Sequence, residues 1–339
     1  MSTQQNVTVM AQRRGEVVLE ERSIPEPKRD EFLIKTKRTL ISIGTELTTL
    51  SGEFSPDSVW ARFGSNFPRP FGYSNIGKVI NVGRDVKKHW IGKTVATYKG
   101  GYHAQYVIGK PENSCRVPQN IKDDHATFFV LARTAMNGVR RGRVQWGETV
   151  AIYGLGVLGQ LATRFCYIAG ARPVVGLDIS RQRLKYLHGL QGIVGINPNT
   201  HEFLDHMKNL TKGHLFDVVF EVTGNPDIIP QEFEILKTQG RFVVLSSPRG
   251  KTLFDFHDLC NFPSYSIIGA HSSSHPQALI PDNPWTKKRH TELFFELITD
   301  GRLNIESLIT HRENYEKAPE IYKMLLKDRS QALGIVLKW

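Results

Sequence analysis

The sequence predicts an α/β protein in which a β-rich domain accompanies a doubly wound parallel sheet. Up to about residue 118, short apolar runs are separated by glycine and proline turns, which is typical of a small barrel of strands. Beyond residue 123, apolar runs of strand length alternate with segments of helical periodicity, which is typical of a parallel sheet covered by helices. The predicted domains are residues 1–122, 123–272 and 273–339, and the third segment is expected to return to the first domain.

Strands of the first domain are predicted where valine, isoleucine and threonine dominate. They fall at residues 31–44, 75–83, 93–98 and 104–109. Four glycines punctuate this region at a spacing typical of turns: Gly72, Gly77, Gly83 and Gly92. The pattern favours short strands joined by tight turns.

The second domain is predicted to begin with a helix at 124–141, capped by Asp123 or Asp124. Strands follow at 149–153, 173–178, 216–221, 241–245 and 266–270. Helices are predicted at 157–169 and at 181–190, the latter capped by Ser180. After a polar loop at 271–284, helices at 291–300 and 318–327 precede a last strand at 332–337.

Composition excludes several classes of protein. No apolar run reaches the roughly 20 residues that span a bilayer, and the N-terminus lacks an apolar signal core, so we expect a cytoplasmic protein without a membrane partner. Three widely spaced cysteines without a CxxC pair indicate a reducing compartment and no structural zinc site. The net charge of +11 is not gathered into a nucleic-acid-binding motif, so no nucleic-acid partner is expected.

The sharpest motif is a glycine pattern that follows the strand at 149–153 and opens the next helix. Gly154 permits a tight turn, Gly156 lets the backbone approach a pyrophosphate, and Gly159 lets helix and sheet pack closely. Val157 and Leu158 begin the helix, whose N-terminal N–H groups favour phosphate. The motif predicts a dinucleotide site, and the alternative is a similar fold that binds another ligand.

Asp178 ends the second strand of this unit, where an acid binds the ribose hydroxyls of NAD and repels the 2′-phosphate of NADP. NAD is therefore favoured over NADP. The nearby Arg181 and Arg183 weaken this preference, because an arginine can accommodate that phosphate. Thr223 and Ser246, which follow the predicted strands 216–221 and 241–245, are further cofactor-binding candidates.

Several runs in order resemble the medium-chain dehydrogenase/reductase family. Residues 72–83 with 91–95 are similar to its GHExxGxVxxVG…GxxV signature, 104–107 to its AEYV strand, and 126–141 to the helix before its cofactor domain. The resemblance covers nearly the whole chain. It implies a GroES-like catalytic domain, then a Rossmann domain, then a return to the first.

Zinc-dependent members of that family carry ligands at three positions that differ here. Their Cys-Gly-Thr/Ser-Asp run reads Ile43-Gly44-Thr45-Glu46, their GHE reads Gly72-Tyr73-Ser74, and their third ligand falls close to Val130. Isoleucine and valine cannot bind zinc, so we expect no zinc. The pattern resembles, locally, a zinc-less branch that includes bacteriochlorophyllide dehydrogenases.

Without zinc, a hydrogen-bond donor must polarise the substrate oxygen. The resemblance places Tyr73 in the nicotinamide pocket, where it either acts as acid and base or fills the space of the metal. Thr45 matches a proton-relaying hydroxyl of relatives, and Glu46 follows it; the alternative is that both hold a turn together. Thr134 matches a residue near the nicotinamide. His271, in the polar loop, is a candidate acid or base or an ordinary loop residue.

Three functions compete. The first is hydride transfer between a nicotinamide and a secondary alcohol or ketone, the second is reduction of an activated C=C bond, and the third is dinucleotide binding without catalysis. The expected partner is a small-molecule substrate, and Arg62 and Arg69, in the loop before the glycine signature, would suit an anionic one. The resemblance implies a homodimer through the edge strand at 266–270.

Overall fold

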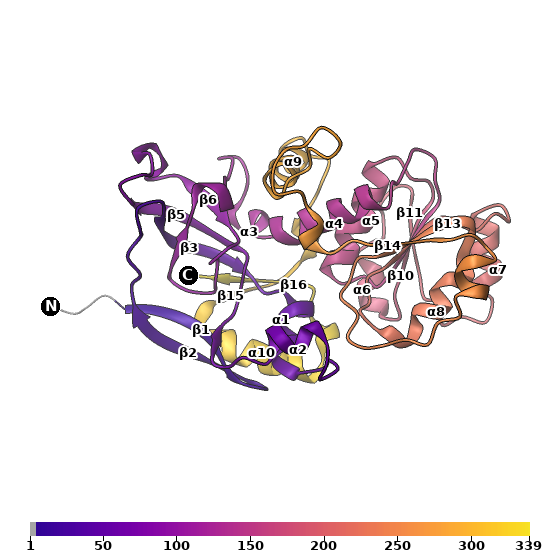
Figure 1. The fold of residues 1–339 in the computed structure, drawn as a ribbon, viewed down its shortest axis with the longest axis horizontal. Coiled ribbons are helices and arrows are strands. Elements are labelled where there is room, and N and C mark those ends of the chain that lie inside the picture. The colour runs from indigo at the N-terminus through magenta and orange to yellow at the C-terminus, as the bar shows by residue number, and fades with distance from the viewer. Residues whose placement is uncertain (1–4) are drawn as a thin grey trace. The chain divides into compact units, whose positions relative to one another are not determined.

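The computed structural model describes residues 5–339, which form two compact units. Unit 1 joins the chain up to Val130 with Lys287–Trp339, and unit 2 is Leu131–Thr286 (Figure 1). The first boundary falls inside helix α4 (Phe129–Arg141). The structure confirms the α/β class and the accompanying parallel sheet.

Unit 1 is built on two sheets. One is three-stranded in the order β2-β1-β4, and the other is seven-stranded, in the order β15-β16-β3-β5-β6-β8 with β7 also paired to β3. β16 (Gly334–Lys338), near the end of the chain, pairs with β3 (Phe32–Leu40). The other strands are β1 (Gln5–Arg13), β2 (Glu16–Ser23), β4 (Arg69–Pro70), β5 (Asn75–Val82), β6 (Thr94–Thr97), β7 (Tyr106–Gly109), β8 (Ser114–Arg116) and β15 (Ile309–Asn314).

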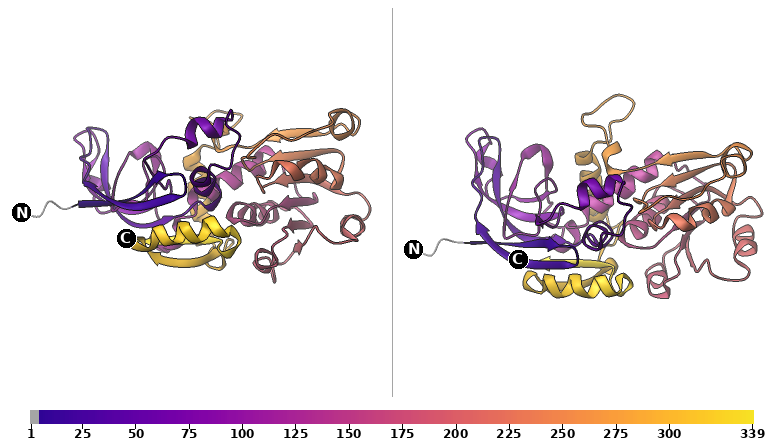
Figure 2. Two further views of the ribbon diagram at one scale, coloured as in Figure 1. Left: turned by 90° about the horizontal axis from the view of Figure 1, so that it is seen from below. Right: turned by 60° about the horizontal axis from the view of Figure 1, so that its bottom comes forward.

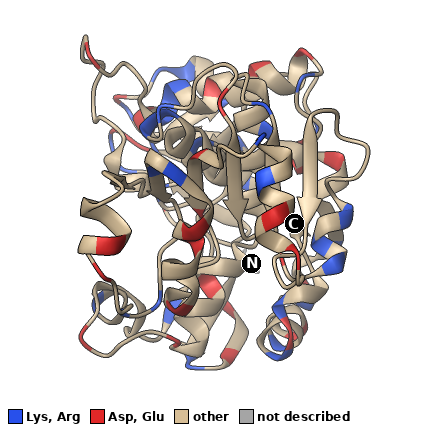
Figure 3. Ribbon diagram, turned by 90° about the vertical axis from the view of Figure 1, so that its right-hand side faces the viewer, with Lys and Arg blue, Asp and Glu red and all other residues tan. Residues whose placement is uncertain are grey.

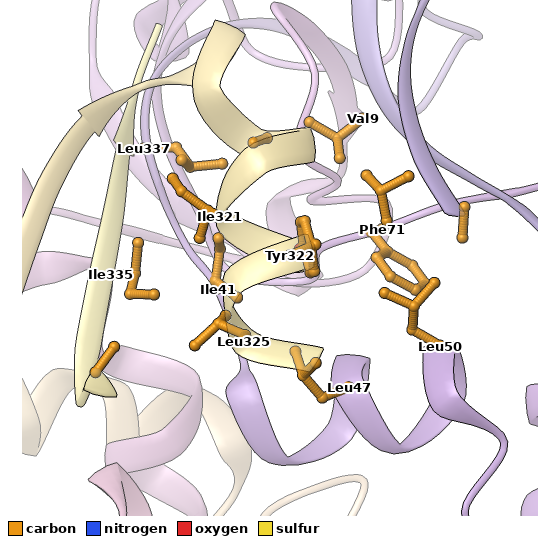
Figure 4. Close-up of a cluster of buried hydrophobic side chains, with 14 residues drawn as sticks. Val9, Ile41, Leu47, Leu50, Phe71, Ile321, Tyr322, Leu325, Ile335 and Leu337 are labelled. Carbon is orange, nitrogen blue, oxygen red and sulfur yellow. The ribbon is translucent and has the colours of Figure 1, made fainter. Parts of the chain in front are cut away.

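The core of unit 1 brings the C-terminal segment against the N-terminal one. α10 (Ala318–Lys327) turns Ile321, Tyr322 and Leu325 toward apolar side chains of β1 and α1 (Ile43–Ser51), as Figure 4 shows. Burial of such side chains contributes roughly 1.5–3 kcal/mol each. The remaining helices of unit 1 are α2 (Val59–Gly64), α3 (Asp123–Ala126) and α9 (Lys287–Thr299).

Unit 2 is a six-stranded parallel sheet in the order β11-β10-β9-β12-β13-β14. The order runs outward in both directions from β9 (Val150–Tyr153), so a topological switch point lies beside this strand, where such folds bind ligands. Helices flank the sheet (Figures 1 and 2). The other elements are β10 (Val174–Leu177), β11 (Ile193–Ile196), β12 (Phe216–Glu221), β13 (Leu236–Val244), β14 (Ser266–Gly269), α5 (Val157–Ile168), α6 (Arg181–Lys185), α7 (Phe203–Leu210) and α8 (Ile229–Glu232).

Some predicted elements differ from the observed ones. The helix at 124–141 is split into α3 and α4. The break lies at Thr127, because its carbonyl accepts a hydrogen bond from the Ser74 hydroxyl and its own hydroxyl donates to the Asp124 carbonyl at 2.6 Å. The strand at 31–44 ends at Leu40, and α1 follows it. The helix predicted at 181–190 is shorter in the structure, where α6 ends at Lys185. The strand β11 is not among the predicted elements.

Charge is distributed rather than concentrated. Lys and Arg segments are interspersed with Asp and Glu segments in Figure 3. Across residues 5–339, no helix has the length and apolar character that crossing a membrane requires.

Candidate functional site: a dinucleotide turn and a buried carboxylate cluster

The turn between β9 and α5 has the space that a dinucleotide phosphate needs. Gly154 has φ +91°, and a Cβ there would lie 2.9 Å from the Thr223 nitrogen. A Cβ on Gly159 would lie 1.8 Å from the Gly154 carbonyl oxygen, so only glycine lets the helix pack this closely. A Cβ on Gly156, in contrast, would meet no atom within 4 Å, and the backbone is open to a ligand there.

The start of α5 is suited to an anion. Gly156 is its N-cap and supplies no side-chain hydrogen bond, so the amides of Val157 and Leu158 in the first turn have no side-chain cap. Unpaired N–H groups at a helix N-terminus, together with the helix dipole, attract phosphate. The residues therefore fit the pyrophosphate of a dinucleotide.

Asp178 lies directly beside this turn. Its Oδ2 accepts a hydrogen bond from the Leu155 nitrogen at 2.7 Å, and its Oδ1 accepts one from the Ser180 nitrogen at 2.8 Å. Arg183 Nη1 lies 3.5 Å from Asp178 Oδ2. The Asp178 side chain is only 5% exposed, so its charge is held against the glycine turn and is partly offset by the guanidinium.

Thr223 and Ser246 meet at a second carboxylate that the sequence reasoning missed. Glu221, at the end of β12, is fully buried and accepts hydrogen bonds from the Thr223 hydroxyl at 2.7 Å, from the Gly224 nitrogen at 2.7 Å and from the Ser246 hydroxyl. These bonds order the loops that follow β12 and β13. Both hydroxyls thus serve Glu221, and their contact with a cofactor stays a prediction.

A third carboxyl, Glu232 in α8, lies in the same buried region. Burial and the charge of Glu221 raise the pKa of Glu232 to about 10, so it is neutral at pH 7. Neither of its oxygens has a hydrogen-bond partner within residues 5–339. Burying a carboxyl group without a hydrogen-bond partner costs folding free energy, and this cost grows at high pH, where the carboxyl loses its proton.

In unit 1, the predicted residues Tyr73 and Glu46 belong to one polar cluster. The Tyr73 hydroxyl donates to Ser42 Oγ, and the Ser42 nitrogen donates to Glu46 Oε1 at 3.0 Å. Glu46 Oε2 accepts from the Tyr322 hydroxyl, and His103 Nε2 lies 3.3 Å from it. Glu46 is 4% exposed, so its carboxylate is bonded to these neighbouring side chains and not to solvent.

His103 is fully buried, and its position explains the glycine at 72. Gly72 has φ +93°, and a Cβ there would lie 2.7 Å from Cγ of the His103 ring. His103 Nδ1 has no hydrogen-bond partner among the described residues, and its Nε2 lies 3.3 Å from Glu46 Oε2. Ser42 and Tyr322 have no local sequence pattern that would mark them as members of this cluster.

The remaining predicted residues are not part of either cluster. Thr45 is exposed in the first turn of α1, and Thr134 is half-buried on α4 in unit 2. His271 is exposed, and its Nδ1 accepts from the Ser273 nitrogen at 3.2 Å, which caps the short turn 272–274. This contact gives His271 a local structural role.

Donor chemistry at the three family ligand positions does not suit zinc. Ile43 and Val130 carry no donor atom, and the Tyr73 hydroxyl is engaged with Ser42. Within the part of the chain that the structure describes, no three His, Cys, Asp or Glu side chains are grouped to hold a metal ion.

Comparisons with known proteins agree with this architecture. Residues 157–284 match the family model described as zinc-binding dehydrogenase. The chain is 26% identical to an L-threonine 3-dehydrogenase of Pyrococcus furiosus, over 94% of this chain and 95% of the relative. It is 29% identical to a D-guloside 3-dehydrogenase of Escherichia coli, over 79% and 77% of the two chains.

Solved structures share the fold over the full length. An Escherichia coli oxidoreductase/dehydrogenase of unknown specificity superposes with a TM-score of 0.84, 20% identity and 99% of each chain covered. A putative zinc-binding dehydrogenase of Sinorhizobium meliloti, solved with NADP, gives a TM-score of 0.81 at 20% identity, covering 99% of this chain and all of the other. These two structures support the GroES-like plus Rossmann fold.

The relatives are named dehydrogenases, and the glycine turn fits a dinucleotide, so the findings support an NAD(P) cofactor. The family match at 157–284 includes none of the three ligand positions at 43, 73 and 130, and it therefore does not bear on zinc in this chain. The comparisons support an oxidoreductase: residues 157–284 are similar to the zinc-binding dehydrogenase family, and the relatives that match most of the chain are named dehydrogenases.

Proposed function

We propose that this protein transfers hydride between NAD(H) and a secondary alcohol or ketone without zinc. The observation that carries the proposal is Tyr73, which stands at a family zinc-ligand position with its hydroxyl bonded to Ser42 Oγ. When bound, the nicotinamide supplies the hydride acceptor or donor. The chain must then bind the dinucleotide, orient the substrate oxygen and manage its proton.

The proton role falls to Tyr73. In ketone reduction the Tyr73 hydroxyl gives its proton to the oxygen that becomes the alcohol, and in alcohol oxidation the phenolate form of Tyr73 accepts that proton as the carbonyl forms. Ser42, fixed by its backbone bond to Glu46, holds the phenol in one orientation. Ile43 and Val130 offer no metal ligand that could replace this group.

A preference for NAD over NADP is supported by Asp178, whose charge disfavours a 2′-phosphate. Arg183 at 3.5 Å offsets that charge in part, so we expect the preference to be moderate. The structure solved with NADP belongs to a relative in fold only, and it does not decide the preference here.

The substrate class follows from the relatives in outline. L-threonine and D-guloside dehydrogenases both act on a secondary hydroxyl that neighbours other polar groups, and we propose a substrate of this kind. Arg62 is exposed and Arg69 half-buried, which favours a small molecule with an anionic group. C=C reduction and non-catalytic binding are not favoured, since the relatives act on CH–OH groups.

We also propose a cytoplasmic homodimer. The three cysteines are unpaired, as in reducing compartments. β14 ends the sheet of unit 2 with exposed residues, including Ile267 at 44% exposure, and such an edge favours pairing with a second copy. Light scattering on a sizing column would give twice the 38.4 kDa chain mass, and a monomer at micromolar concentration would exclude this dimer.

The decisive experiment combines metal analysis with titration of NADH and NADPH by fluorescence. We expect binding of NADH by protein that contains no stoichiometric zinc and that keeps its activity after chelation. One zinc per chain that is required for turnover would overturn the zinc-independent mechanism. Failure to bind either nucleotide would overturn the proposed function as a whole.

A further inference from the structure

Arg164 is a buried cation in α5 without an acidic partner. It is 6% exposed, and no carboxylate lies within ion-pair distance of it among residues 5–339. Its Nη1 donates to the Gln160 carbonyl at 2.9 Å and to Gln160 Oε1 at 2.7 Å, and its Nη2 donates to the Tyr186 carbonyl at 2.9 Å. Burial lowers the pKa of Arg164 to about 10. Burying a charge without an opposite charge costs free energy, and the three hydrogen bonds of Arg164 offset part of that cost.

Gln160 completes the arrangement. It is fully buried, and its Nε2 donates to the Arg183 carbonyl at 2.9 Å and to the Leu155 carbonyl at 3.5 Å. Gln160 and Arg164, which we call the α5 clamp, therefore hold the glycine turn and the carbonyls at the end of α6. α6 has only five residues, so these side-chain bonds add to the few backbone bonds that hold it, such as the one from the Tyr186 nitrogen to the Arg183 carbonyl at 3.3 Å.

The other end of α6 is attached to Asp178. The Ser180 hydroxyl caps the helix by accepting from the Arg183 nitrogen at 3.4 Å, and the Ser180 nitrogen donates to Asp178 Oδ1. Arg183 is thus held at its nitrogen by Ser180, at its carbonyl by Gln160 and at its guanidinium by Asp178. Its side chain is 23% exposed and Asp178 only 5%, so the guanidinium is the more accessible of the two.

We infer that Gln160 and Arg164 are positioning residues that set the coenzyme selectivity by fixing Arg183 beside Asp178. The inference rests on the proposed dinucleotide function and adds the residues that control its specificity. With Arg183 in place, the repulsion between Asp178 and a 2′-phosphate is offset and a phosphate partner is available. When the clamp is lost, α6 is held less firmly and Arg183 neutralises Asp178 less. The affinity for NADPH therefore falls more than the affinity for NADH.

The test compares coenzyme affinities in the full chain. Arg164→Met and Gln160→Met should each raise the ratio of the NADPH Kd to the NADH Kd by about three- to tenfold, the scale of one partly buried ion pair. Arg183→Leu should give the largest ratio, and the ratio of Arg164→Lys should lie between those of wild type and Arg164→Met. Thr163→Val is the matched control, because Thr163 is equally buried in α5 but bonds only to the Gly159 carbonyl at 2.8 Å.

Hydrogen exchange provides a readout that needs no coenzyme. The amides of residues 184–187 should exchange faster in Arg164→Met and Gln160→Met than in Thr163→Val, because α6 loses its attachment. A ratio that stays at the wild-type value while NADH still binds would overturn the inference and leave the proposed function standing. Wild-type protein that binds neither nucleotide would overturn both.

Discussion

Tyr73 is the residue on which the proposed chemistry depends most directly. Tyr73→Phe removes the hydroxyl and keeps the ring, so we expect kcat to fall by about 10²–10⁴-fold while the Kd for NADH stays unchanged. Steady-state kinetics on a panel of secondary alcohols, with NADH titration alongside, would measure both. Tyr315→Phe is the matched control, because it loses one hydroxyl bond to Gln105 elsewhere in unit 1. Equal activity of Tyr73→Phe and wild type would reduce Tyr73 to a space-filling role.

Glu232 makes a pH-dependent prediction in unit 2. Its pKa is about 10 when folded and near the ordinary glutamate value of 4.5 when unfolded, so the folded state keeps a proton that the unfolded state releases. Stability therefore falls as pH rises between these values, by at most about 1.4 kcal/mol per pH unit. Glu232→Gln should flatten this slope in urea unfolding at pH 6, 7.5 and 9. Parallel slopes for both proteins would show that Glu232 is ionised in the folded state.

At the scale of elements, α10 and α1 are joined by a hydrogen bond within an apolar core. The ring centroids of Tyr322 and Phe71 are 5.4 Å apart, and the Tyr322 hydroxyl donates to Glu46. Tyr322→Phe keeps the packing and should cost about 1–3 kcal/mol of unfolding free energy, because a buried carboxylate oxygen loses a donor. Tyr322→Ala adds a cavity and should cost about 3–5 kcal/mol. Chemical denaturation gives both values, and an unfolding free energy that is unchanged in Tyr322→Phe would contradict the assigned hydrogen bond.

The elements also show where sequence reasoning succeeds and where it stops. The turn from β9 to α5 and Asp178 could be predicted because their chemistry is encoded within about 25 consecutive residues. The cluster at Glu46 could not, since His103 and Tyr322 lie 57 and 276 positions away in sequence. The break between α3 and α4 was missed for the same reason, because the Ser74 hydroxyl that ends α3 comes from a distant segment. Glu221 was missed because a glutamate at the end of a strand has no distinguishing local pattern.

Across the whole molecule, an ion network closes unit 1 between its first and last segments. Glu306 contacts His125 at 2.7 Å, and Arg312 bonds to both Glu306 and Asp124, which also binds Arg38 at 2.7 Å. The return segment is thus attached to the start of α3 by charge as well as by the pairing of β16 with β3. A chain that leaves a domain and returns needs such contacts, because the return closes a long loop at an entropic cost.

This network predicts an acid-sensitive contribution to stability. The hydrogen bond from His125, opposed by partial burial and aided by Arg312, lowers the pKa of Glu306 to about 2. A carboxylate with a lowered folded pKa stabilises the fold above its unfolded value near 4.5, and this contribution is lost as pH falls from there toward 2. Glu306 is 45% exposed, so solvent screening limits the contribution to under about 1 kcal/mol.

Glu306→Gln should therefore melt below wild type at pH 7, and the gap should close as the pH falls from 4.5 toward 2. Glu296→Gln, an exposed change on α9, is the control and should leave the melting temperature unchanged at each pH. Calorimetry at several pH values and two salt concentrations would measure the gap, which should narrow at high salt because exposed ion pairs are screened. A gap that persists unchanged at pH 2 would mean that Glu306 acts through packing, and the attachment of the return segment would then rest on β16 alone.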